Sequence, residues 1–250
     1  MLIGTDLARA LDPVVFAQAC GITPDPWQAD LLTSAAPRAL LCCSRQSGKS
    51  TTTGLIALHC SIYAPGSLII VVSPSQNQSS ELLRTIKALH ASIEGAPELL
   101  GDSVLKIALA NGSRILALPG NATTVRGYAG VSLVIIDEAA GAEDGLIQAV
   151  FPMLATVAHG RLIALSTPKG KRGWFYEQWA GGDPLWKRVK IVAKDCPRIS
   201  PDFLAEQMKL LGPTRYAEEF ECEFLDDLAS AFPTDIIDRA FTTEISPLWG

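Results

Sequence analysis

The sequence predicts an α/β fold, in which a mainly parallel sheet carries helices on both faces and a small C-terminal lid subdomain follows. Short apolar runs alternate with longer stretches of helical pattern. The runs are apolar throughout, as expected for strands that are buried on both faces of a parallel sheet. After about residue 183 this alternation stops, and an apolar and basic run is followed by stretches of helical pattern.

Each element is bounded by where its pattern begins and ends. The apolar runs predict core strands at residues 39–43, 68–73, 133–137 and 161–166. Helices are expected where a turn or a small polar residue can cap a helical pattern. They cover residues 49–63, 75–93, 146–157 and 173–180.

A hairpin is expected between the second helix and the third core strand. Residues 104–110 and 113–118 flank Asn111-Gly112, and both residue types tolerate the positive φ angles of a tight turn. We therefore expect an antiparallel excursion at the edge of the sheet.

The C-terminal part is expected to be a separate unit. An apolar and basic strand at residues 186–192 precedes helical stretches at residues 201–211 and 213–220. The expected division is a core at residues 1–182, a lid or linker subdomain at 183–235, and the start of a linker to a further domain at 236–250.

Composition narrows the classes of function only slightly. The formal net charge of -5 and the pI near 5.3 give no overall attraction to nucleic acid, so a DNA contact would need a local basic patch. The six cysteines form no C-x-x-C pair, which favours buried reduced thiols in an intracellular protein. No export signal is expected, and no apolar run approaches the ~18 residues of a membrane span.

A phosphate-binding loop is predicted between the first strand and the first helix. Gly48-Lys49-Ser50 stands directly after the strand and directly before the helix. Lys49 would neutralise the β- and γ-phosphate oxygens, and the Ser50 hydroxyl would ligate Mg²⁺. Cys43 replaces the usual first glycine, so a plain strand-to-helix turn with a surface lysine remains an alternative. The expected nucleotide-binding residues here are Ser44, Arg45, Gln46, Ser47, Gly48, Lys49, Ser50 and Thr51.

A second motif delivers two carboxylates at the end of an apolar strand. Asp137 would hold Mg²⁺, directly or through water, and Glu138 would orient and polarise the attacking water. The alternative is a buried strand that ends in an acidic helix cap. The order of lysine loop and carboxylate strand favours the nucleotide site.

Two arginines are candidates for stabilising charge in the transition state. Arg45 lies inside the loop, beside the expected position of the γ-phosphate. Arg126 precedes the carboxylate strand and could serve as an arginine finger that reaches a neighbouring subunit. A solvated surface arginine is the alternative in both cases.

Further candidates flank these motifs. Trp27-Gln28 lies upstream of the first strand, where the amide could read an adenine edge while the aromatic ring packs nearby. Ser166-Thr167 ends the fourth core strand and could sense the γ-phosphate and couple hydrolysis to distant parts of the fold. A polar strand end before Pro168 is the alternative.

Charged runs are the remaining candidates. Lys169, Lys171 and Arg172 are candidate DNA contacts, although solvated faces are favoured for such runs. The acidic residues between 218 and 227 are contiguous rather than convergent, so a solvated linker is favoured over a metal site.

Together these segments resemble the ATPase domain of viral terminase large subunits, the DNA-packaging motors of tailed bacteriophages. The loop is the most specific element, because this family also lacks the first glycine in its S-R-Q-x-G-K-S sequence. The resemblance runs from about Pro26 to the end of the chain. It rests on Trp27-Gln28, residues 44–50, Arg126-Gly127, residues 135–139 and residues 165–168.

The resemblance implies an additional-strand (ASCE, RecA-like) P-loop ATPase with a lid subdomain. In this family an RNase H-like nuclease follows, which does not fit into 250 residues, so an isolated ATPase domain is expected. ATP and Mg²⁺ are the implied cofactors. Double-stranded viral DNA, a portal protein and a small terminase subunit are the implied partners, at the procapsid in the host cytoplasm and without a membrane. A pentameric ring is implied during packaging, with a monomer in isolation as the alternative.

The resemblance also implies roles for single residues. Gln28 takes the adenine-recognition position and Arg45 that of the loop arginine. Arg126 resembles an arginine proposed to act in trans within a ring of subunits. The phosphate, metal, carboxylate and coupling roles fall to Lys49, Ser50, Asp137, Glu138, Ser166 and Thr167.

Two other readings stay open. A superfamily-2 helicase fragment shares a glutamine motif, a lysine loop, paired carboxylates and an S-T-P element, but the chain has no room for a helicase's second lobe. A nucleotide-gated assembly module would bind ATP to build a ring and hydrolyse little by itself. Stimulation of phosphate release by DNA and portal distinguishes a motor from such a module.

Overall fold

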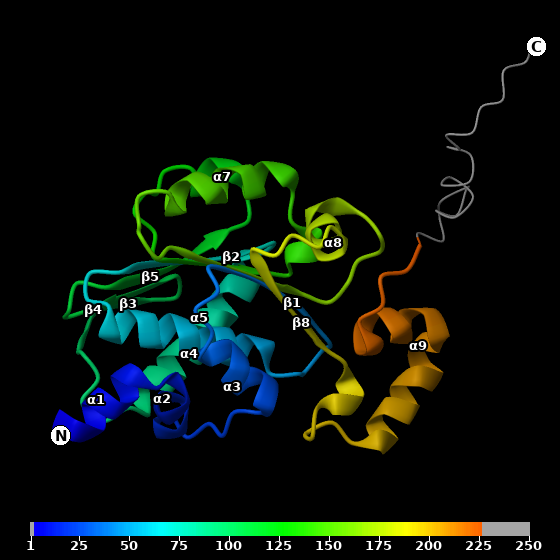
Figure 1. Cartoon of the computed structure of the whole chain (residues 1–250), viewed down its shortest axis with the longest axis horizontal. Helices are drawn as coiled ribbons and strands as arrows, with labels where there is room; N and C mark the ends of the chain where they lie inside the picture. The colour runs from blue at the N-terminus through cyan, green and yellow to red at the C-terminus, as the bar shows by residue number, and fades with distance from the viewer. Residues whose placement is uncertain (1–2, 227–250) are drawn as a thin grey trace, which may run out of the picture.

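The computed structural model describes residues 3–226, and its centre is one twisted eight-stranded sheet (Figure 1). The strands lie in the order β3-β4-β5-β2-β6-β7-β1-β8. Their bounds are β1 (Arg38–Cys43), β2 (Leu68–Ser73), β3 (Leu99–Ser103), β4 (Lys106–Leu109), β5 (Arg114–Pro119), β6 (Leu133–Asp137), β7 (Arg161–Ser166) and β8 (Trp186–Ile191).

The predicted mainly parallel sheet is confirmed. The six strands from β5 to β8 in the sheet order pair in parallel, and only β3, β4 and β5 pair with one another antiparallel. The hairpin turn at Asn111-Gly112 is confirmed, with φ of 86° at Gly112. Strand β5 also pairs in parallel with β2, so the hairpin is an extension of the main sheet.

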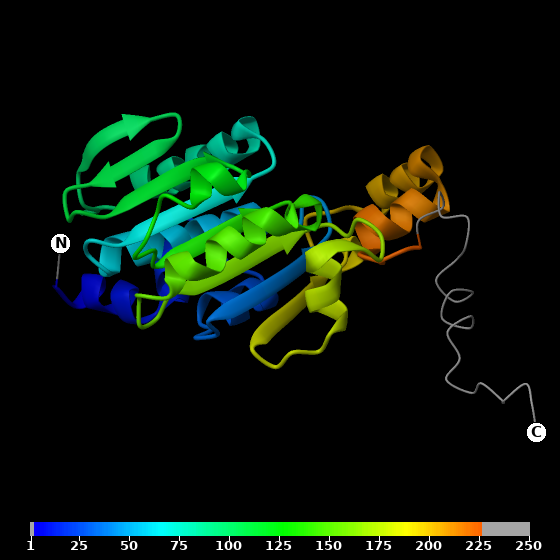
Figure 2. The same ribbon diagram turned by 90° about the horizontal axis from the view of Figure 1, so that it is seen from above.

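Helices cover both faces of the sheet (Figure 2). One face carries the helices that precede β1, together with α4 and α5, and the other face carries α6, α7 and α8 (Figure 1). The bounds are α1 (Ile3–Leu11), α2 (Pro13–Ala19), α3 (Pro26–Leu32), α4 (Lys49–Tyr63), α5 (Gln76–Ala91), α6 (Ala122–Val125), α7 (Asp144–Leu154) and α8 (Gly173–Ala180). Short 3-10 turns follow β6 and β8, at η1 (Ala139–Gly141) and η2 (Ala193–Asp195).

The core divides into two layers because side chains alternate across each strand. Along β1, Leu41 and Cys43 pack with α4 and α5 on one side, whereas Leu40 and Cys42 pack with the layer of α7 and α8 on the other. All these β1 side chains are fully buried. The runs that are apolar throughout therefore belong to strands covered on both faces, as expected.

The boundary expected at residue 182 does not coincide with the end of the sheet. Strand β8 pairs in parallel with β1 along its whole length, so the sheet includes residues assigned to the lid. After β8 in the sequence, α9 (Pro201–Glu221) lies outside the sheet, beyond strands β1 and β8 (Figure 1). Its helical path is broken at Gly212 (φ 73°), close to the expected break between two helices. The expected linker at 236–250 and the last part of the expected lid, 227–235, lie outside the described residues.

All six cysteines are free thiols, and five of them are buried. Within residues 3–226, no helix is long and apolar enough to cross a membrane.

Candidate functional site

The motif residues converge at the carboxyl edge of the sheet. The carboxyl ends of parallel strands meet at one edge, and the register places Cys42 of β1 beside Ser166 of β7 and Asp137 of β6 beside Leu165. The loop that follows β1 therefore lies at the same edge as the ends of β6 and β7. This edge is where open α/β sheets bind ligands.

The loop between β1 and α4 leaves its amide groups available for a ligand. Gln46 and Gly48 adopt positive φ angles of 58° and 90°, and α4 begins at Lys49. Within residues 3–226, the backbone N–H groups of residues 46–51 donate to no protein acceptor. A row of unpaired N–H groups at a helix N-terminus binds anions. The geometry therefore fits a phosphate group, as the sequence predicts.

The Gln28 side chain connects the residue before α3 with α4, next to the loop, through two hydrogen bonds. Its Oε1 accepts a hydrogen bond from the Asp25 N–H at 2.8 Å, and its Nε2 donates to Thr52 Oγ1 at 2.8 Å. Gln28 is only 4% exposed, and Thr52 Oγ1 in turn donates to the Gly48 carbonyl at 3.0 Å. The amide thus braces the loop and α4 in this structure, a different task from the expected adenine recognition. Trp27 packs, half-buried, against the core layer below.

The two carboxylates at the end of β6 have different environments. Asp137 is 9% exposed, and burial together with the neighbouring Glu138 raises its pKa to about 6, against a smaller opposing effect of Lys49. The Glu138 N–H donates to Asp137 Oδ1 at 3.0 Å. Glu138 is half-buried and left-handed (φ 53°, ψ 42°), and such strained backbone is concentrated at functional sites. The buried Asp137 suits its expected role as a Mg²⁺ ligand, and the half-buried Glu138 suits its expected role of orienting the attacking water.

Asp137→Asn is expected to stabilise the nucleotide-free protein at about pH 7, by at most about 3 kcal/mol, the equivalent of raising this pKa to about 6. The folded pKa is raised, so the ionised carboxylate destabilises the fold above about pH 6. That penalty disappears as the pH falls towards about 4. Urea unfolding of both proteins at about pH 7 and about pH 4 measures the gap. A gap that is unchanged at the lower pH, or a less stable variant at pH 7, would contradict the assignment.

Arg45 does not point freely into the site in this structure. Its guanidinium makes a two-pronged ion pair with Glu219 of α9, from Nε at 2.6 Å and from Nη2 at 3.1 Å. The Arg45 N–H also donates to the Glu219 carbonyl at 3.3 Å. The loop arginine is therefore held by α9 here, and its role beside the γ-phosphate stays a prediction.

The remaining candidates are placed differently from one another. Ser166 and Thr167 are 1% and 8% exposed at the carboxyl end of β7, beside the loop strand. Arg126 is exposed at the C-terminal end of α6, and no ion pair of its guanidinium is found within residues 3–226. Its position on the surface is compatible with a contact outside its own subunit, and the role of Arg126 as an arginine finger stays a prediction.

The candidate DNA contacts face the C-terminal segment. Lys171 Nζ pairs with Asp226 at 3.1 Å, and the Lys171 N–H donates to the Leu225 carbonyl. Next to it, the Gly170 N–H donates to Glu218 Oε1 at 2.8 Å. Lys171 is thus engaged inside the molecule, and DNA contact by Lys169, Lys171 and Arg172 stays a prediction. Among the described residues, no cluster of three or more acidic, histidine or cysteine side chains could hold a metal ion.

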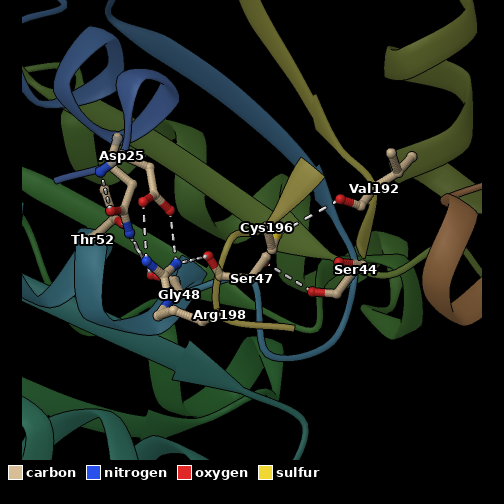
Figure 3. Close-up of polar contacts among 9 residues, drawn as sticks. Asp25, Ser44, Ser47, Gly48, Thr52, Val192, Cys196 and Arg198 are labelled. Carbon is tan, nitrogen blue, oxygen red and sulfur yellow. Dashed lines mark hydrogen bonds and ion pairs between the residues drawn. The ribbon is translucent and has the colours of Figure 1, made fainter. Parts of the chain in front are cut away.

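Sequence reasoning missed two residues that contact the loop. Arg198, in the turn before α9, donates to the carboxylate of Asp25 and to the carbonyl of Ser47 (Figure 3). The sequence predicts that Glu219 belongs to a solvated acidic run, but in the structure its carboxylate binds Arg45. The available signal was weak: an isolated arginine after a strand, and a glutamate in a helix that only the folded chain brings to the loop.

This chain is similar in sequence to terminase large subunits. Residues 40–239 match the family model described as "Terminase large subunit, T4likevirus-type, N-terminal". The large terminase subunits of Thermus virus P23-45 and Thermus phage G20c are each 27% identical to this chain, over 87% of it and 52% of their own length. The chain thus spans about half the length of the curated relatives it matches.

Solved structures show the same fold. The large terminase ATPase domain of Thermus phage P74-26 superposes with a TM-score of 0.72 at 23% identity, over 84% of this chain and 97% of that one. The large terminase of the thermophilic bacteriophage D6E in complex with ADP gives 0.63 at 11% identity, over 87% and 53%.

Proposed function

Because this chain belongs to the terminase large subunit family, whose N-terminal domain it matches, we propose that it is the ATPase motor domain that drives packaging of double-stranded DNA into a procapsid. The observation that carries the proposal is the loop after β1. Its unpaired N–H groups at residues 46–51 lie at the same sheet edge as Asp137 and Glu138. A phosphate-binding loop together with a carboxylate pair is the equipment for hydrolysing a nucleoside triphosphate.

Each residue at this edge has a proposed role in nucleotide binding or hydrolysis that follows from its chemistry. Lys49 and the loop N–H groups bind and neutralise the phosphates. The Ser50 hydroxyl and the Asp137 carboxylate are hard oxygen ligands, which suit Mg²⁺, and the cation would supply charge neutralisation at the phosphate oxygens. Glu138 orients a water molecule and accepts its proton. Ser166 and Thr167, buried beside the loop strand, would couple the state of the site to the sheet.

Arg45 and Arg126 supply positive charge in this proposal. Arg45 would leave Glu219 and turn to the phosphate, and Arg126 would act on the site of a neighbouring subunit in a pentameric ring. A portal protein, a small terminase subunit and viral DNA in the host cytoplasm complete the proposed setting. Lys169, Lys171 and Arg172 remain candidate DNA contacts, and ATP binding through the adenine position near Trp27 and Gln28 remains part of the proposal.

The proposal is tested by phosphate release from Mg-ATP. The wild-type chain is expected to hydrolyse ATP and to be stimulated by DNA and portal. Lys49→Ala is expected to reduce turnover to background, because Lys49 is the cation proposed to neutralise the β- and γ-phosphate oxygens, and Arg45 has a separate proposed role in stabilising the charge of the transition state. Lys209→Ala, on the exposed face of α9, is the matched control and should leave turnover unchanged.

Two outcomes would contradict the proposal in different ways. Turnover that survives Lys49→Ala would exclude the loop as the nucleotide site. Turnover that DNA and portal fail to stimulate would favour the nucleotide-gated assembly module over the motor.

A further inference from the structure

Arg198 lies outside the motif residues but contacts the phosphate-binding loop. It belongs to a tight turn after β8 and η2, which the Ile199 N–H closes by donating to the Cys196 carbonyl at 3.0 Å. The same turn touches the start of the loop, where the Cys196 thiol meets the Ser44 hydroxyl (Figure 3). The segment that leads into α9 is therefore packed along the outer side of the loop.

The guanidinium of Arg198 joins two other parts of the chain. Nη1 and Nη2 donate to the two carboxylate oxygens of Asp25 at 3.0 Å and 2.8 Å, and Nη2 also donates to the Ser47 carbonyl at 3.1 Å (Figure 3). Asp25 is the residue before α3, only 14% exposed, so the two-pronged ion pair fixes the guanidinium against a stable anchor.

The bond to Ser47 determines the direction of an amide that faces the ligand. In a planar trans peptide group the C=O and the following N–H point in opposite directions. Arg198 holds the Ser47 carbonyl on the side of the loop that faces away from the expected phosphates. The Gly48 N–H is therefore directed towards the side where the phosphates are expected to bind. Thr52 and Gln28 do the same for the next peptide group, because they bind the Gly48 carbonyl at 3.0 Å and 3.5 Å and so direct the Lys49 N–H.

The contact between the guanidinium and the loop is close. A methyl group added at Gly48 would lie 3.2 Å from Arg198 Nη2 and 2.8 Å from Gln28 Nε2. Arg198 itself is 50% exposed, so its ion pair adds little to the stability of the fold. The geometry of this side chain thus matters more for the loop than for the fold.

From these contacts we infer that Arg198, anchored by Asp25, is a positioning residue that holds the Gly48 N–H towards the phosphates of a bound nucleoside di- or triphosphate. The inference rests on the proposed function. An amide that is already oriented binds phosphate without a cost of reorganisation. The same interaction is made with the substrate and in the transition state, so its loss weakens binding rather than the chemical step.

The test is ADP binding by calorimetry, together with steady-state ATP turnover, for Arg198→Ala. The expected result is a Kd for ADP and a KM for ATP that are each about tenfold higher, the size of one hydrogen bond, with kcat nearly unchanged. Arg198→Lys should rescue only partly, because one ammonium group cannot replace a planar fork that binds Asp25 and Ser47 together. Arg84→Ala removes another exposed ion-paired arginine, on α5, and should change neither constant.

The anchor is tested by Asp25→Asn, which should raise the same two constants in the same direction. The double variant should then be no worse than Arg198→Ala alone, because both changes remove one contact. An unchanged Kd in Arg198→Ala would overturn the inference, as would an effect of Arg198→Ala that Asp25→Asn does not share. A wild-type chain that binds no ADP would instead overturn the proposed function.

Discussion

Glu138→Gln is expected to lower steady-state ATP turnover by about 10²–10⁴-fold, the usual contribution of a general base, while ADP binding stays close to that of the wild type. Glutamine has nearly the shape of glutamate, but its amide cannot accept a proton from water. Glu138 follows directly after β6 and is held in a left-handed conformation next to the buried Asp137. Its position therefore depends on backbone that the substitution leaves intact.

The measurement is phosphate release at saturating Mg-ATP, with calorimetric binding of ADP as the second readout. Glu206→Gln, an exposed acid-to-amide change on α9, is the control and should leave both readouts unchanged. Wild-type turnover in Glu138→Gln would show that another group activates the water. Loss of ADP binding would show that the substitution disturbs the site as a whole.

The central sheet could be predicted because its signals are local. The apolar run of β6 ends abruptly at Asp137, and the expected bounds of β2, β6, β7 and α4 agree with the structure. Strand β3 was missed because Gly101 and Asp102 are residue types that strands disfavour. The short helix α2 begins at Pro13 and has only seven residues, too few to show a helical period.

The contacts around the loop could not be predicted, because they join distant parts of the chain. Arg198 and Asp25 are 173 residues apart, and Arg45 and Glu219 are 174 residues apart. No pattern in the sequence states which carboxylate an arginine will meet. The sequence singles out Gln28 as a candidate for adenine recognition, but the direction of its amide depends on Asp25 and Thr52, which only the folded chain brings together.

Gly48→Ala is expected to abolish nucleotide binding and to lower turnover by at least about 10²-fold, the cost of a displacement of about 1 Å at a reacting site. Two independent effects act at this position. The backbone has φ of 90°, which disfavours any residue with a side chain. The added methyl group would also meet Gln28 Nε2 at 2.8 Å and Arg198 Nη2 at 3.2 Å, so both braces of the loop must move.

Gly182→Ala separates the effect of a positive φ angle from the effect of displacing Gln28 and Arg198. Gly182 has φ of 70° in the turn after α8, and an added methyl group would meet no atom within 4 Å. This control is expected to lose stability to thermal or urea unfolding by roughly 1–2 kcal/mol, with ADP binding and turnover unchanged. If Gly48→Ala lost only stability, as the control does, the loop would tolerate displacement of its two braces. The orientation of its amides would then not depend on Gln28 and Arg198, because the loop backbone alone would be sufficient to hold them.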